Sequence, residues 1–223
     1  MTKLLIAAIG PNGSSLKTLA LSGTWANTKG AKKLPLLSAA RAEGIVNDPA
    51  AVQEGAYSVE PVHTRVLFSV SHMGFTNYYG EFPYVSGELN PKPKAVGTST
   101  LEIHIPIASV STGNAKLNGE LAGDQWLDAA KYPEMVFKSE KGEPTDKDTA
   151  KVTGNLTLHG VTKPVTLTVK FHGAGVNVLD KKYTVGFDVS GKIKRSDFGV
   201  KTHLPLIGDE LDLTIAAAFE QHN

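Results

Sequence analysis

The 223-residue chain contains no cysteine, so disulfide bonds and thiol chemistry are excluded and cysteine usage gives no clue to the compartment. It also lacks an apolar run of the roughly 20 residues that a membrane-spanning helix needs. The formal net charge is only +1, so no strong field attracts nucleic acid. The glycine-rich nucleotide loops and the G-x-S-x-G motif of hydrolases are absent as well. These absences favour a globular protein that neither binds nucleic acid nor inserts stably into a membrane.

Alternation of apolar and polar residues with a period of two is the strongest pattern that the chain does contain. It runs through residues 100–107 and returns at 165–172, 183–190 and 210–215. Because successive side chains of a β-strand point to opposite faces, each stretch has one apolar and one polar face. The sequence predicts eight strands, at residues 63–73, 79–89, 99–107, 135–139, 151–159, 164–173, 182–194 and 209–220.

One stretch in the middle of the chain departs from this pattern. Residues 114–122 favour a short helix, and Asp124 is placed to cap a further helical turn that ends at Ala130, before Pro133. The short turns elsewhere favour an antiparallel sheet with a helical insertion near 114–130. Such a sheet buries its apolar face either by closing into a barrel or by stacking in two layers, and the pattern alone allows both.

The chain divides into three parts by composition. Residues 1–42 carry six basic residues and no acidic one, with a short apolar run at 4–9 and the small-x-small sequence Ala-Arg-Ala at 40–42. We predict an atypical export signal there, the alternatives being a disordered extension or a wrongly assigned start codon. Residues 43–55 are predicted to be a linker, and residues 56–221 the β-domain.

Four segments of the β-domain resemble the YceI family, in the same order along the chain. They are residues 63–74 (HTRVLFSVSHMG), 123–133 (GDQWLDAAKYP), 154–165 (GNLTLHGVTKPV) and 194–199 (KRSDFG). The resemblance implies an all-β, eight-stranded antiparallel lipocalin-like barrel in the periplasm, and it implies that dimers are common. Related proteins hold a long polyisoprenoid, an isoprenoid quinone or a fatty chain in the lumen. Family members carry a clean signal peptide, and residues 1–42 depart from that pattern.

The apolar strand faces have two interpretations, a filled core or the wall of a tunnel for an apolar chain. The resemblance favours the tunnel. The predicted wall residues are Phe68, Val70, Phe82, Ile103, Ile105, Phe137, Leu156, Leu167, Val169, Phe171, Val185, Phe187, Leu213 and Ile215.

Residues of the family motifs are candidates for the mouth of this tunnel. The guanidinium of Arg195 suits a polar or phosphate-bearing head group, but a structural ion pair with Asp197 or Asp124 is the favoured alternative. Trp126 either gates the entrance or, as is more common, plugs the barrel with its indole N–H bonded to backbone. The predicted mouth residues are His72, Asp124, Trp126, Arg195, Asp197 and Phe198.

Three functions remain open at this point. The first is a non-catalytic carrier or store for a long-chain isoprenoid or fatty lipid, such as a polyprenyl chain or a ubiquinone-like molecule. The second is a small barrel enzyme that acts on a hydrophobic substrate through a buried Asp/His pair. The third is an interaction module with a solid core. The seven histidines show no metal-binding spacing, so we predict no metal. Because the catalytic motifs named above are absent, we also predict no cofactor and no catalytic residue, and we favour the first function.

Overall fold

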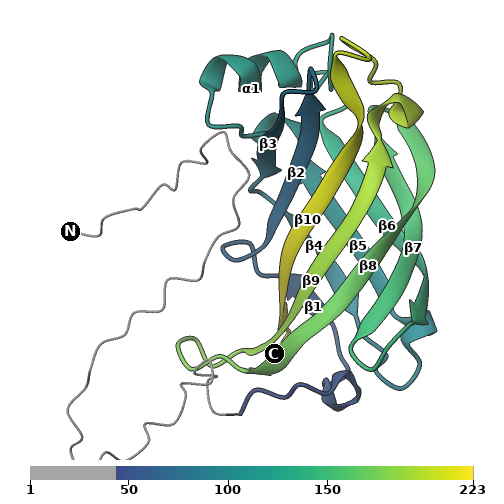
Figure 1. Ribbon diagram of the computed structural model, residues 1–223. Helices are drawn as coiled ribbons and strands as arrows, with labels where there is room; N and C mark the ends of the chain where they lie inside the picture. Colours follow the sequence, from purple (N-terminus) through teal and green to yellow (C-terminus); the bar gives the residue numbers. More distant parts are fainter. Residues whose placement is uncertain (1–43, 223) are drawn as a thin grey trace, which may run out of the picture. The chain divides into compact units, whose positions relative to one another are not determined.

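The computed structural model describes residues 44–222, so the predicted export signal at 1–42 lies outside the described residues. Within them the chain forms a closed antiparallel β-barrel of eight strands with one short α-helix (Figure 1). The predicted fold class is therefore confirmed. No helix in this part of the chain has the length and apolar character to cross a membrane.

Ten strand segments make up the eight barrel strands. Segments β1 (Tyr57–Val59) and β2 together form one barrel strand, and β3 and β4 together form the next. The ring closes where β1 pairs with both β4 and β10. The remaining bounds are Arg65–His72 (β2), Thr76–Phe82 (β3), Ser86–Asn90 (β4), Thr100–Pro106 (β5), Glu134–Pro144 (β6), Thr149–Leu158 (β7), Val161–Val176 (β8), Tyr183–Lys194 (β9) and Ile207–Gln221 (β10).

Proline residues interrupt the first two barrel strands. Pro61 lies between β1 and β2, and Pro83 lies between β3 and β4. Proline has no N–H to donate to a ladder, so it is tolerated where pairing is already broken. The uninterrupted strand predicted at 79–89 is corrected accordingly, and β1 was missed because it is only three residues long.

The predicted helix is confirmed in its first part only. Helix α1 spans Ala115–Ala122, and the side chain of Asn114 caps it by accepting a hydrogen bond of 3.2 Å from the N–H of Leu117. The further helical turn predicted after Asp124 is wrong. Residues 123–133 form successive non-helical turns instead, since Asp128 has a left-handed backbone (φ 47°) that no α-helix accommodates.

The turn between β7 and β8 consists of His159 and Gly160, both with positive φ. A Cβ at Gly160 would collide with the ring of Tyr132. We expect Gly160→Ala to lower the free energy of unfolding by roughly 1–3 kcal/mol, measured by chemical denaturation. The control is Gly119→Ala in α1, where a Cβ meets nothing within 4 Å. That substitution should be stabilising or neutral, and equal losses in the two variants would contradict this account.

Residues 44–55 pack against the barrel, and we call them the strap. Val46 exchanges two backbone hydrogen bonds with Ala174 of β8, of 2.8 and 3.1 Å. The 3-10 turn η1 (Pro49–Ala51) follows, and Val52 is buried in the core. Residues 44–55, the described part of the predicted linker, therefore pack against the barrel, with Val52 buried at its end.

Candidate functional site: a cavity inside the barrel

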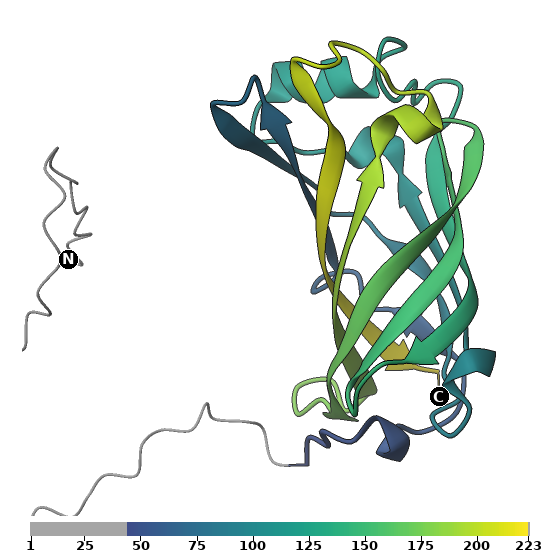
Figure 2. The same ribbon diagram turned by 45° about the vertical axis from the view of Figure 1, so that its right-hand side comes forward.

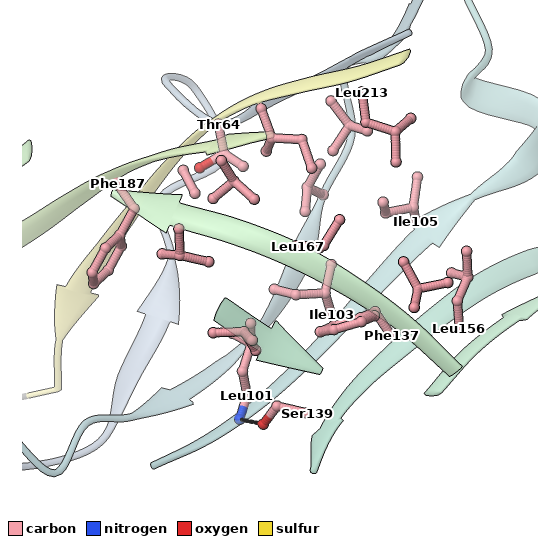
Figure 3. Close-up of a pocket in the computed structure, with 18 of the residues that line it drawn as sticks. Thr64, Leu101, Ile103, Ile105, Phe137, Ser139, Leu156, Leu167, Phe187 and Leu213 are labelled. Carbon is pink, nitrogen blue, oxygen red and sulfur yellow. Dashed lines mark hydrogen bonds between the residues drawn. The ribbon is translucent and has the colours of Figure 1, made fainter. Parts of the chain in front are cut away.

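A cavity of about 410 Å³ lies inside the barrel and is bordered by side chains from all eight strands (Figure 3). This volume falls in the range of roughly 300–1,000 Å³ that is typical of small-molecule sites. The interior of an eight-stranded barrel is wide enough for packed side chains or one slender ligand. Here inward-facing residues such as Phe68, Leu167 and Leu213 keep accessible surface, so they face a space that the protein does not fill.

The cavity wall is largely apolar, and the two hydroxyl groups of Thr64 and Ser139 that border it are already hydrogen-bonded. The hydroxyl of Thr64 accepts from the N–H of Ala218 at 3.0 Å and donates to its carbonyl at 3.2 Å. The hydroxyl of Ser139 accepts from the N–H of Leu101 at 2.8 Å (Figure 3). No buried side-chain polar atom among the described residues lacks a partner. The middle of the cavity is therefore suited to hydrocarbon rather than to a polar solute.

Thirteen of the fourteen predicted wall residues border the cavity. The exception is Val185, which is fully buried next to Ala174 and Phe219 on the neighbouring strands. Alternation places its side chain on the inner face, but it does not tell where along the strand the cavity ends. The same alternation would have found further bordering residues that were not predicted: Leu101, Val152, Val189, Ile193 and Leu211.

One end of the cavity lies among α1, the turns of residues 123–133 and the segment 195–206, and we call it the α1 end. Arg195 borders the cavity there and is only 4% exposed. Its Nε, Nη1 and Nη2 donate to the carbonyls of Gly208, Val200 and Ile207 at 2.8, 3.1 and 2.8 Å. Burial lowers the pKa of this guanidinium, and the carboxylate of Asp209 acts in the opposite direction.

The predicted partners of Arg195 and Trp126 are corrected by these contacts. Neither Asp197 nor Asp124 forms an ion pair with Arg195; both are exposed, and backbone carbonyls take their place. Trp126 lies over the guanidinium, with 5.3 Å between its ring centroid and Cζ, and its edge meets His203. Among the described residues its indole N–H has no backbone acceptor, so the predicted bond is absent. The geometry is nevertheless that of a plug.

The six predicted mouth residues do gather at the α1 end, but only Trp126 and Arg195 border the cavity. Phe198 is buried in the core, and His72 lies at the end of β2 beside Tyr78. No cavity-lining residue described at this end is exposed. The α1 end is therefore the closed end of the cavity rather than its mouth.

The opposite end of the cavity is open, and we call it the strap end. It is formed by the strap and by the loops at residues 91–99 and 145–148. All exposed residues that border the cavity lie here: Lys92, Thr100, Pro144, Asp146 and Lys147. The sequence pattern does not reveal this rim, because its lysines and aspartates look like ordinary solvent-exposed loop residues.

No histidine is among the described residues that border the cavity, so the Asp/His pair that a barrel enzyme would use is absent from this lining. The one Asp–His pair in the described chain is His172 with Asp188, whose Nδ1 and Oδ2 are 2.9 Å apart. Both side chains are exposed on the outer face of the barrel. Within residues 44–222 no three His, Asp or Glu side chains gather in a metal-binding arrangement.

Comparison with known proteins places this geometry in a family. The YceI-like domain model matches residues 57–219, which is most of the chain. The chain belongs to the YceI-like family. Protein YceI from Escherichia coli is 37% identical over 157 residues, which cover 70% of this chain and 81% of that protein.

Solved structures of the YceI-like fold agree with the barrel. BcnA from Burkholderia cenocepacia superposes with a TM-score of 0.65 at 27% identity, covering 72% of this chain and 98% of its own. A polyisoprenoid binding domain from Saccharophagus degradans, implicated in plant cell wall breakdown, superposes with a TM-score of 0.57. Its identity is 19%, over 74% of this chain and 98% of its own, so it supports the fold alone. The strap lies outside the residues that the YceI-like domain model matches.

Proposed function

We propose that this protein binds one long-chain apolar lipid, a polyisoprenoid or an isoprenoid quinone, inside its barrel and carries or stores it without catalysis. The observation that carries the proposal is the apolar cavity that runs between the closed α1 end and the open strap end of a YceI-like domain. The Saccharophagus degradans domain, which shares the fold, is itself named for polyisoprenoid binding.

The energetics of burial fit a flexible hydrocarbon. Each buried CH₂ contributes roughly 0.8 kcal/mol, so one isoprene unit contributes about 3–4 kcal/mol. A few units therefore give useful affinity after the cost of association. Since non-covalent affinity saturates near roughly −20 kcal/mol, further units add little. In this account the tail supplies the affinity, and the polar rim at the strap end meets water or a head group.

The other two functions fit the geometry less well. An enzyme needs reactive groups beside the substrate, and the Asp–His pair found here faces solvent outside the barrel. A ligand-free interaction module predicts a filled interior, whereas inward side chains here border a cavity. The proposal includes residence in the periplasm, where such a carrier would shield lipid from water between membranes, and it allows for a homodimer.

Native mass spectrometry of the protein purified without detergent tests this proposal. We expect a complex with one lipid per chain, and extraction with organic solvent should release an intact polyprenyl or quinone species. Recovery of the protein without lipid, together with no uptake of added polyprenol, would contradict the proposal. Conversion of an added lipid to a product would favour the enzyme.

A further inference from the structure

The strap crosses the open end of the barrel and is attached on both sides of it. Figures 1 and 2 show this segment beneath the barrel, at the end opposite α1. On one side Val46 pairs with Ala174 of β8, and Ile45 packs over Gly173 and Gly175. On the other side the carboxylate of Glu54 lies 3.1 Å from Nζ of Lys92, in the loop that forms the rim.

Two further hydrogen bonds hold the strap in place between these two attachments. The hydroxyl of Tyr57, a fully buried residue, donates to the carbonyl of Gln53 at 2.7 Å. Burial, with a smaller effect of Tyr183, raises the pKa of Tyr57 to about 12, so this hydroxyl keeps its proton. The side chain of Gln221 donates to the carbonyl of Glu54 at 3.1 Å. These hydrogen bonds join the strap to β1 and β10, so it is part of the barrel end.

Two strap residues, Pro49 and Val52, border the cavity itself. Val52 is 9% exposed and belongs to the core cluster. Both residues lie upstream of residues 57–219, which the YceI-like domain model matches. The part of the cavity that they cover therefore lies outside the matched domain.

We propose that the strap is a specificity element, in which Val52 and Pro49 set the maximum length of the chain that the cavity accepts. This inference rests on the proposed lipid-binding function. A chain inserted toward Trp126 meets a closed end, so any excess length must be accommodated at the strap end. At that end Pro49 and Val52 form part of the wall that it meets. The strap wall therefore decides how many isoprene units are shielded from water.

Opposite substitutions at Val52 test the proposal in the full-length protein. The probe is an equimolar mixture of polyprenols that differ by one isoprene unit, and the bound fraction is analysed by mass spectrometry. With Val52→Trp, whose larger ring fills the end of the cavity, the bound distribution should move to shorter chains. With Val52→Ala it should move to longer chains. The matched control is Val62→Trp, at an exposed position (66%) that does not border the cavity, and it should leave the distribution unchanged.

The outcomes separate this inference from the proposed function. Opposite shifts in the two Val52 variants support the strap as the length limit. Normal binding with the wild-type length distribution in both variants overturns the inference and leaves lipid binding intact. Wild-type protein that takes up no polyprenol overturns the proposed function itself. If circular dichroism shows that Val52→Trp does not fold, Val52→Ala alone tests the proposal. A length distribution that does not move to longer chains in Val52→Ala then contradicts it.

Discussion

Leu167→Asp is expected to lower the affinity for a polyprenyl ligand by roughly a thousandfold, which corresponds to about 4 kcal/mol. Leu167 borders the cavity from β8 and points into it (Figure 3). Without ligand, water that enters from the open end hydrates the new carboxylate. With an apolar chain bound, the carboxylate loses this water beside the apolar Val152 of the neighbouring strand, and an unpaired charge in an apolar site is costly. Binding is measured by competition with a fluorescent polyprenol analogue.

The matched control for this prediction is Thr168→Asp, one residue further along the same strand. Thr168 is exposed and points away from the lumen, so the same charge should leave the affinity unchanged. The pH dependence adds a second check. A carboxyl group in an apolar cavity has a raised pKa, so binding by Leu167→Asp should recover as the pH falls and the group becomes neutral. Equal affinities of the two variants, or no recovery at low pH, would show that the ligand does not occupy the lumen.

Arg195→Leu should lower the free energy of unfolding by about 3 kcal/mol or more, because three backbone carbonyls lose their charged donor. For a domain of this size the melting temperature should fall by roughly 6–12 °C. The closed end would loosen, since the guanidinium joins η4 (Arg195–Phe198) to the start of β10 and supports the ring of Trp126. Thermal unfolding followed by circular dichroism measures the effect.

The control is Lys194→Leu at the exposed neighbouring position, which should change stability by less than about 0.5 kcal/mol. Ligand binding distinguishes the two interpretations of Arg195. A structural role predicts that Arg195→Leu weakens the binding of polyprenyl phosphate and of a bare isoprenoid hydrocarbon equally. A selective loss of the phosphate-bearing ligand, at unchanged stability, would instead identify Arg195 as a head-group site and reverse the assignment of the closed end.

The sequence was sufficient for the barrel and for most of its inner wall. Residues such as Ile103, Leu167 and Phe187 alternate with polar neighbours, and a strand has only two faces, so their inward direction follows from the pattern alone. The choice of a barrel over stacked sheets came from the family resemblance, because both architectures require the same alternation.

The ends of the cavity were not predictable in the same way. Arg195 is buried because the chain after it returns and places the carbonyls of residues 200, 207 and 208 around the guanidinium. Alternation along strands does not predict the path of such a loop. The open rim at Lys92 and Lys147 arises because loops from three parts of the chain meet at one end. The strap was not predicted because residues 44–55 show no periodicity, and the burial of Val52 depends on the closed barrel.

A crystal structure of the protein purified without delipidation tests the central claim most directly. We predict continuous, elongated electron density in the lumen, beginning beside Trp126, passing Leu167 and ending near Lys92 and Val52 at the strap end. A lumen that contains only ordered water, or one filled by repacked side chains of the protein, would contradict the account.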